Sequence, residues 1–353
     1  MYSDLSEDYT LGELVRKMPM ISKNNSEGRR RAFTLMEVIV AVALFAMIIS
    51  FTSVIFNVSA DSYRMAMANN EIMLKFRAIV DQINTDFAGI DRKAPLAILC
   101  YYENDTDGNV QRYDQVMFFA TGDFSSYNEV SGNILYSNAA RIYYGQARTV
   151  DSGSTIEPWA QKNMATGEPT GILGRRQHVL TVDSSLTDWH GTPFGNFSTA
   201  DNNREEYDKV SLSRWESISI TEFGDLISSC MEVADTRPKI DFDDMASTLH
   251  NFLCDGISSF TVQLVETANW TSPTLERMQW FPINAFLNQY TNPLGAYWYV
   301  KDGADFTSSG VMWQFEPVRL KKIRAIKFTF TIRDKRGVIK GGRTFTHIVY
   351  LGE

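Results

Sequence analysis

The sequence predicts an α+β protein in which one long N-terminal helix precedes a head domain built on an antiparallel β-sheet. Three observations support this fold class: an apolar segment at 38–56, a helical-period stripe of apolar residues after it, and segments of alternating polarity near the C-terminus. The chain has 353 residues, of which 44% are hydrophobic, so the part beyond the apolar segment is long enough to enclose a core.

The apolar segment contains 19 residues, of which only Ser50, Thr52 and Ser53 are polar. At 1.5 Å per residue, a helix of this length measures about 28 Å, close to the thickness of a bilayer core. Three arginines at 29–31 precede it, and the positive-inside rule keeps such a cluster in the cytoplasm. We therefore expect a transmembrane helix at 33–56.

This orientation places residues 1–32 in the cytoplasm and exports the chain beyond the helix. Glu37 is the exception within the apolar region, because a carboxylate inside a spanning helix costs about 2.5 to 3.5 kcal/mol. We expect another group to compensate the charge of Glu37.

Beyond the membrane segment, apolar residues recur at spacings of three, four and seven, which is the period of a helix with one apolar face. They are Met65, Ile72, Phe76, Ile79, Ile83, Phe87 and Ile90. No proline lies between Phe33 and Pro95, so the same helix can continue. We expect an amphipathic extension at 57–92 that packs on the head domain.

The head domain is expected at 93–353. Its strand patterns are a hairpin at 96–102 and 113–120, an alternating strand at 253–264, and a closing hairpin at 326–333 and 343–351. Residues 121–210 are rich in Gly, Ser, Thr, Asn and Asp and predict a loop-rich insertion. Strand candidates within it are 141–150 and 177–182, and a short helix is expected at 220–233.

Charge and cysteine content limit the classes of function. The net charge is −8, so the chain lacks the basic surface of a nucleic-acid binder, and we expect no nucleic-acid partner. Cys100, Cys230 and Cys254 have no metal-binding spacing. Outside the cytoplasm one disulfide can form, with Cys230 and Cys254 the favoured pair, and free buried thiols are an equal alternative.

The sequence contains no Gly-rich phosphate loop, no nucleophile-elbow serine and no H-E-x-x-H helix. The four histidines are scattered singly, and each is better explained as structural than as catalytic. They are His178, His190, His250 and His347. We therefore predict no catalytic residue and no enzymatic activity.

One segment has the spacing of a calcium loop. Asp105, Asp107 and Asp114 fall at positions 3, 5 and 12 of the twelve-residue pattern that starts at Glu103. Glutamate at position 1 and flanking strands favour a polar hairpin tip, so calcium bound by these three aspartates is the weaker hypothesis. No other cofactor is expected.

Residues 29–38 read Arg-Arg-Arg-Ala-Phe-Thr-Leu-Met-Glu-Val and lead directly into the apolar segment. This stretch resembles the processing signal of type IV prepilins, in which Phe-Thr-Leu-x-Glu opens an apolar helix after a basic leader. The resemblance implies cleavage between Ala32 and Phe33 by a prepilin peptidase and N-methylation of Phe33. It also implies that Glu37 pairs with the terminal ammonium of a neighbouring subunit, which would compensate its charge.

Segments near the C-terminus resemble the J-type minor pseudopilin of type II secretion and related minor pilins. They are an Asp-Gly-Ile-x-x-Phe strand at 255–260, Trp270, Trp280, and a last strand Arg-Thr-Phe-Thr-x-Ile-Val at 343–349. The likeness implies a pilin-like fold and a single-pass protein of the bacterial inner membrane with a periplasmic head. Its partners would be membrane lipid and, through the helix, other pseudopilins or pilins.

The resemblance therefore predicts a minor pseudopilin, a structural subunit of a secretion pseudopilus that takes part in protein export. The closest alternative is a minor type IV pilin for pilus assembly, adhesion or DNA uptake. An alternative of another class is a membrane-tethered extracytoplasmic domain that binds a ligand or hydrolyses a substrate. A plain signal anchor leaves Glu37 unexplained, and a signal peptide cut after Ala60 would have a shorter apolar region.

Overall fold

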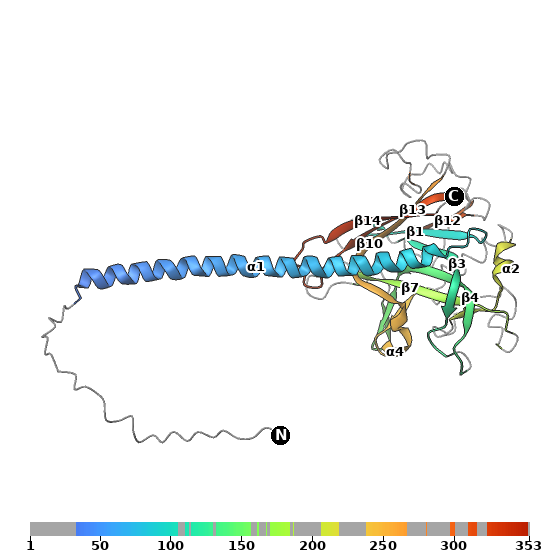
Figure 1. Ribbon diagram of the computed structural model, residues 1–353, viewed down its shortest axis with the longest axis horizontal. Coiled ribbons are helices and arrows are strands. Elements are labelled where there is room, and N and C mark those ends of the chain that lie inside the picture. Colours follow the sequence, from blue (N-terminus) through green and yellow to red (C-terminus); the bar gives the residue numbers. More distant parts are fainter. Residues whose placement is uncertain are drawn as a thin grey trace, which may run out of the picture. The chain divides into compact units, whose positions relative to one another are not determined.

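The computed structural model shows a long helix and a β-rich head (Figure 1). The residues that the structure describes are 33–104, 110–112, 114–129, 132–156, 161, 167, 170–183, 186, 206–218, 238–266, 280, 297–300, 310–315 and 323–351. The chain divides into two compact units after Ala60. The predicted leader lies outside the described residues.

Helix α1 (Leu35–Ala88) is the one helix of the described part that is long and apolar enough to cross a membrane. Within its first unit, the hydroxyl of Ser50 donates to the carbonyl of Ala46 at 2.9 Å, and that of Thr52 donates to Ile48 at 2.8 Å. These bonds satisfy polar groups inside the helix itself, as a segment surrounded by lipid requires.

In the second unit, the predicted apolar stripe of α1 packs into the core of the head. Ile72, Ile79 and Ile83 are fully buried, and Phe87 lies 4.1 Å from the ring of Phe118. The prediction was wrong for Met65, which is 54% exposed. A helical period identifies the face of a helix that can be buried, but it does not locate the residue at which a partner begins to cover it.

The helix ends where the chain must turn tightly against the sheet. Gly89 follows Ala88, and its carbonyl accepts a hydrogen bond from the backbone N–H of Thr121 at 2.7 Å. A Cβ atom at Gly89 would lie 2.3 Å from the carbonyl oxygen of Thr121. Glycine is therefore required here for close backbone approach.

The head contains an antiparallel sheet, which confirms the predicted α+β class. Along it the strand order is β11-β12-β1-β3-β4-β7-β10-β13-β14, and neighbours in this order are antiparallel. The bounds are β11 (Tyr297–Val300), β12 (Gly310–Phe315), β1 (Leu96–Asn104), β3 (Gln115–Ser125), β4 (Tyr136–Gln146), β7 (Gly171–Leu180), β10 (Phe252–Glu266), β13 (Ile323–Ile332) and β14 (Arg343–Tyr350). Two short strands join it, β2 (Val110–Arg112) beside β1 and β8 (Tyr207–Asp208) parallel to β7.

The alternating strands place their apolar residues on the core side as predicted. On β10 and β13 these residues are fully or almost fully buried, whereas the polar residues between them are half-buried. The buried apolar residues are Phe260, Val262, Leu264, Ile326, Phe328, Phe330 and Ile332, and the polar Ser258 is buried on the same side. Strands β13 and β14 form the predicted closing hairpin, with Ile332 opposite Arg343.

The opposite face of the sheet is also covered. Phe119 of β3 lies 4.7 Å from the ring of Trp215, which belongs to the short helix α2 (Leu212–Glu216). Met117, Tyr143 and other residues of this face complete a second apolar cluster. The sequence did not indicate α2, because a five-residue helix is too short to show a period.

Residues 121–210 are not an insertion, because this interval supplies β4 and β7 in the middle of the sheet. The predicted strand at 141–150 overlaps β4 and β5, and the predicted strand at 177–182 overlaps the end of β7, but their bounds were wrong. The ten residues of β7 are all buried. Strands covered on both faces lose the alternation that identifies strands. In addition, both carry charged residues that only tertiary contacts neutralise. The helix expected at 220–233 lies outside the described residues.

A second, three-stranded sheet has the order β6-β5-β9. Its strands are β6 (Ser154–Ile156), β5 (Arg148–Asp151) and β9 (Lys239–Asp241). The chain continues from β9 into α4 (Met245–Thr248) and the 3-10 helix η3 (Leu249–Asn251), and then into β10.

Cys254 is a free thiol that is 3% exposed, and burial raises its pKa to about 12. The structure therefore favours the buried-thiol alternative for this residue. Cys230 and the side chain of Cys100 lie outside the described part of the chain.

Candidate functional site

The sequence-predicted site lies at the start of α1. The hydroxyl oxygen of Thr34 accepts from the backbone N–H of Glu37 at 3.3 Å, and the carbonyl of Thr34 accepts from Glu37 and Val38. Threonine followed three residues later by glutamate is the spacing of a capping box. The Thr-Leu-x-Glu motif therefore has a local role in starting the helix, which the sequence reasoning missed although the spacing was visible.

Phe33 precedes the helix and is 77% exposed. Ala32 lies outside the described residues. The predicted cleavage point thus adjoins a residue that is not in helical conformation, so cleavage there would leave the helix intact.

The Glu37 side chain is exposed in the first turn of α1. Among the described residues, no hydrogen bond or ion pair reaches its carboxylate. The partial positive charge of the helix N-terminus favours a carboxylate here by about 0.3 to 1 kcal/mol. This gain is smaller than the cost of burying the charge in lipid, so a partner for Glu37 stays a prediction.

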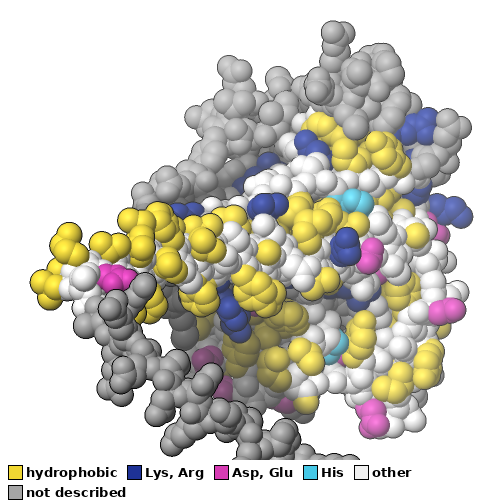
Figure 2. All heavy atoms as spheres, turned by 60° about the vertical axis from the view of Figure 1, so that its left-hand side comes forward, with side chains coloured by type: hydrophobic (Ala, Val, Ile, Leu, Met, Phe, Trp, Pro, Cys, Tyr) yellow, Lys and Arg dark blue, Asp and Glu magenta, His cyan; other side chains and the backbone are white. Residues whose placement is uncertain are grey.

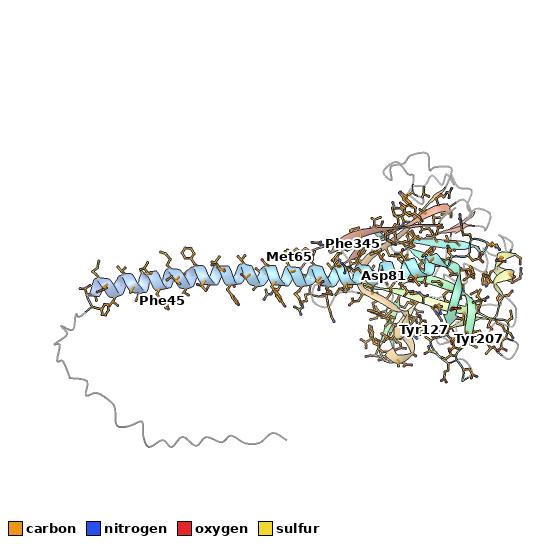
Figure 3. All side chains as sticks on the ribbon, in the orientation of Figure 1. Phe45, Met65, Asp81, Tyr127, Tyr207 and Phe345 are labelled. Carbon is orange, nitrogen blue, oxygen red and sulfur yellow. The ribbon has the colours of Figure 1, made fainter. Side chains whose placement is uncertain are left out.

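The apolar residues of the first half of α1 are exposed on every face of the helix, and Figure 2 shows hydrophobic side chains along the face turned to the viewer. Phe45, labelled in Figure 3, is 64% exposed, and Phe51 and Ile55 are similarly exposed. Soluble proteins rarely expose a contiguous apolar surface of this kind. Lipid or the helices of other subunits must therefore cover it.

A buried ion pair connects α1 to the sheet. Asp86 of α1 accepts hydrogen bonds from Nε and Nη2 of Arg175 on β7, at 2.6 and 2.8 Å. The hydroxyl of Tyr144 on β4 also donates to Asp86, and Gln82 Nε2 donates at 3.2 Å. Asp86 is 4% exposed and Arg175 is 6% exposed. This group fixes α1 against the sheet.

Electrostatics within this group follow from burial and charge. Burial acts to lower the pKa of Arg175, but its hydrogen bonds to Asp86 raise the pKa above its ordinary value. Burial raises the pKa of Tyr144, and the charge of Asp86 acts in the same direction. At neutral pH, Arg175 is therefore charged and Tyr144 is a neutral donor.

A second buried group lies on the opposite face of the sheet. Arg141 Nε and Nη2 donate to the Asp208 carboxylate at 2.6 and 3.0 Å, and His178 Nδ1 lies 3.1 Å from both Arg141 Nη2 and Asp208 Oδ1. Burial lowers the pKa of His178 to about 4, and the charge of Arg141 acts in the same direction. The ionic pair is thus Arg141 with Asp208, and His178 is a neutral neighbour.

We expect the head to lose stability between about pH 6.5 and pH 4 because of His178. In the unfolded chain the imidazole takes up a proton near pH 6.5, whereas in the folded protein it does so only near pH 4. Proton uptake by the unfolded state alone lowers the free energy of unfolding as pH falls, by about 3 kcal/mol over this interval. Chemical denaturation of the parent and His178→Gln at several pH values measures this. If the free energy of unfolding changed with pH equally in the parent and in His178→Gln above pH 4.5, the role assigned to His178 would be contradicted.

The other histidines have structural contacts. His347 Nε2 lies 2.8 Å from Asn84 Oδ1, and His250 Nε2 lies 2.9 Å from Glu206 Oε1. His190 lies outside the described residues.

An open hollow at the β3–β4 hairpin is lined by residues that include Asp123, Ser125 and Tyr136.

The calcium hypothesis remains a prediction for Asp105 and Asp107, which lie outside the described residues. Asp114 is fully buried, with an ion pair to Arg112 at 2.6 Å and a hydrogen bond from the N–H of Val262 at 2.7 Å. These contacts give Asp114 a structural role in joining β2 to β10.

Comparison with known proteins gives one match. Residues 28–53 match the family described as the prokaryotic N-terminal methylation motif. No curated protein and no solved structure matches the chain. The matched residues include Ala32, Phe33 and Glu37, and the apolar helix is consistent with a single-pass inner membrane protein. The motif supports a type IV prepilin-like protein of the pilin or pseudopilin kind, which suggests a structural subunit rather than an enzyme.

Proposed function

We propose that the chain is a minor pseudopilin, a structural subunit of a type II secretion pseudopilus. Prepilin peptidase cleaves it between Ala32 and Phe33, and the new N-terminus at Phe33 is methylated. The head then lies on the periplasmic side of the inner membrane, and the apolar half of α1 lies in the bilayer until assembly.

One observation carries this proposal: an apolar, capped helix with an acidic first turn is directly followed by an antiparallel sheet head. The first half of α1 has its side chains exposed on every face, whereas one face of the second half is buried against its own head. A helix of this kind can move from lipid to a bundle of like helices without changing its own hydrogen bonds.

In a filament, the charge of Glu37 would favour one arrangement of neighbouring subunits over others. The methylated amine of a neighbouring subunit is a cation at the same depth, and pairing removes an uncompensated charge from a low-dielectric region. The energy of the pair depends on the correct stagger between subunits. Glu37 would thereby set the register of the filament.

The experiment is to determine the N-terminus of the membrane-bound protein by sequencing and mass spectrometry. We expect a chain that starts at N-methylated Phe33, because the motif places the cleavage point there. Cells without the peptidase provide the control and should retain Met1. A start at Met1 in normal cells, or at Asp61 after signal-peptidase cleavage, would exclude prepilin processing.

A deletion strain separates the two filament types. Loss of extracellular enzymes with intact surface pili supports the pseudopilin role, whereas loss of pili, adhesion or DNA uptake supports a minor pilin.

A further inference from the structure

An exposed apolar surface lies on the head, separate from the helix that carries the proposed assembly function. We call it the α4 patch, and it has five members with large exposed fractions. They are Tyr127 (52%), Phe242 (48%), Met245 (37%), Leu249 (53%) and Phe252 (37%).

Four members of the α4 patch lie close together in the sequence, on and beside a short helical segment. Phe242 precedes α4, Met245 lies in α4, Leu249 lies in η3, and Phe252 is the first residue of β10. Met245 and Leu249 are four residues apart, so their side chains are neighbours. The exposed side chains therefore form a patch rather than scattered apolar residues.

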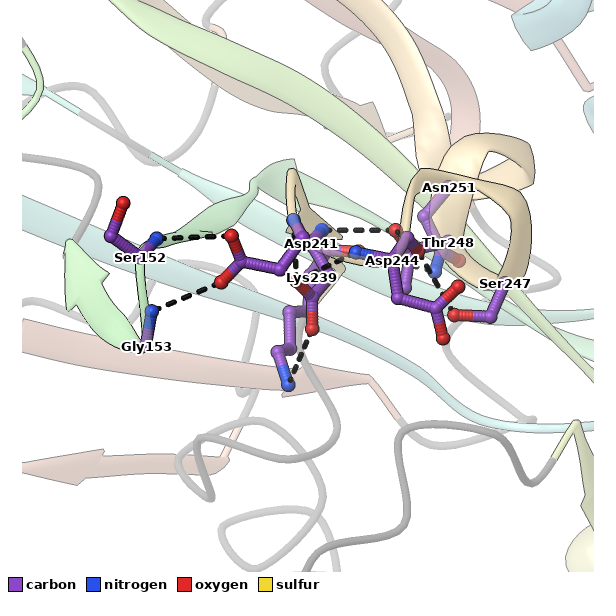
Figure 4. A network of polar contacts seen from close by, with 9 residues as sticks. Ser152, Gly153, Lys239, Asp241, Asp244, Ser247, Thr248 and Asn251 are labelled. Atoms are coloured by element: carbon purple, nitrogen blue, oxygen red, sulfur yellow. Dashed lines mark hydrogen bonds and ion pairs between the residues drawn. The ribbon is translucent and has the colours of Figure 1, made fainter.

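The inward side of the same segment is polar, which reverses the usual arrangement of a surface helix. Thr248 and Asn251 are buried, and the hydroxyl of Thr248 accepts from the N–H of Asp241 at 2.9 Å (Figure 4). Asn251 Nδ2 donates to the carbonyl of Lys239 at 3.4 Å. Polar bonds thus attach the segment to the head, and its apolar residues are left outward. The stability of the isolated head does not explain why the apolar side chains of this segment face outward.

Tyr127 is held beside this segment by a buried carboxylate. Glu206, which is 2% exposed, accepts from the backbone N–H groups of Tyr127 and Asn128, the latter at 3.0 Å. His250 Nε2 lies 2.9 Å from the same carboxylate, and its ring stacks on Tyr127 with centroids 4.7 Å apart. Asn128 Nδ2 also donates to the carbonyl of Ser247 at 3.2 Å.

These bonds connect the β3–β4 loop, the residue before β8, and η3. An interface that is already fixed in shape loses less conformational entropy when a partner binds. Tyrosine, phenylalanine and methionine are also the residue types enriched at protein interfaces.

The edge of the α4 patch is acidic. Asp151, Asp241, Asp243 and Asp244 lie beside it, and Asp243 accepts from the N–H groups of Ser152 and Gly153 at 3.1 and 3.0 Å (Figure 4). Asp241 pairs with Lys239 at 3.6 Å. Asp151 and Asp243 accept hydrogen bonds from Ser152 and Gly153, and within the described residues neither makes an ion pair. These two carboxylates therefore leave negative charge beside the apolar centre.

The negative charge at the edge of the α4 patch limits which kind of partner can bind there. A second copy docked through the same patch would bring two acidic edges together, and an anionic lipid surface would be repelled in the same way. We propose that the α4 patch binds a second protein through a segment whose apolar residues enter the patch and whose lysines or arginines face the aspartates. This surface goes beyond the proposed filament function, because it needs neither cleavage nor Glu37.

The test places p-benzoylphenylalanine at position 249 of the full-length protein in living cells, followed by irradiation and mass spectrometry of the linked peptide. The matched control carries the same group at position 123, where Asp123 is exposed on β3. We expect position 249, but not position 123, to link to a segment of a different protein that contains apolar residues and at least two lysines or arginines.

Charge reversal provides the second arm. Asp151 is exposed and its side chain accepts from the hydroxyl of Ser152, so Asp151→Lys leaves the core intact. In this background we expect the yield of the link from position 249 to fall at least about fivefold, in line with loss of electrostatic complementarity. A link to this chain itself, to phospholipid or to an acidic segment would overturn the proposal. Equal yields at positions 249 and 123, or in the presence and absence of Asp151→Lys, would also overturn it.

Discussion

Glu37→Gln should abolish incorporation of the protein into filaments while leaving its membrane insertion and cleavage intact. The neutral side chain lowers the cost of placing the helix in lipid, so insertion should be equal or better. Within a filament, the terminal ammonium of the neighbouring subunit would have no counter-charge. Breaking a buried pair in this way costs about 3 to 5 kcal/mol, or more than a hundredfold in assembly. Fractionation of filaments from membranes, together with secretion, measures the effect.

Asp61→Asn is the matched control, because it also removes one negative charge from α1. Asp61 is exposed and pairs only loosely with Arg64, at 3.4 Å. Exposed pairs contribute about 0 to 1 kcal/mol, so this variant should assemble like the parent. If Glu37→Gln also assembles and supports secretion like the parent, Glu37 has no pairing role and serves only the helix N-terminus.

Asp86→Ala should destabilise the head by about 3 to 5 kcal/mol, because it leaves the buried Arg175 guanidinium without its partner. The hydroxyl of Tyr144 loses its acceptor at the same time. Denaturant unfolding of the full-length protein in detergent, followed by tryptophan fluorescence, measures the change. Asp81→Ala is the matched control on the same helix, since Asp81 is exposed. We expect its effect to stay within about 0.5 kcal/mol.

A double variant distinguishes the pair from general disruption of the site. Asp86→Leu combined with Arg175→Met replaces both charges with apolar groups of similar volume, which is often neutral or stabilising. The double variant should therefore be more stable than Asp86→Ala. A loss below about 1 kcal/mol in Asp86→Ala would contradict the assigned role of the pair.

The sequence by itself determined the parts of the protein whose physics is local. Residues 38–56 are apolar over a bilayer's thickness, and β10 and β13 alternate at a period of two. Each pattern fixes which face of one element is apolar without reference to any other element. The apolar helix and the closing hairpin followed directly from these patterns, whereas the processing site followed from the resemblance of residues 29–38 to type IV prepilins and stays a prediction.

Only the tertiary structure decided the middle of the sheet and the position of its buried charges. Strands β4 and β7 carry Arg141 and Arg175, whose charges have no partner until Asp208 and Asp86 are placed against them across 67 and 89 residues of sequence. The start of the buried stripe after Met65 and the outward apolar face of α4 were equally invisible. The sequence around a charged or apolar side chain does not determine whether that side chain is buried. Its burial depends on which distant segment supplies the counter-charge or packs over it.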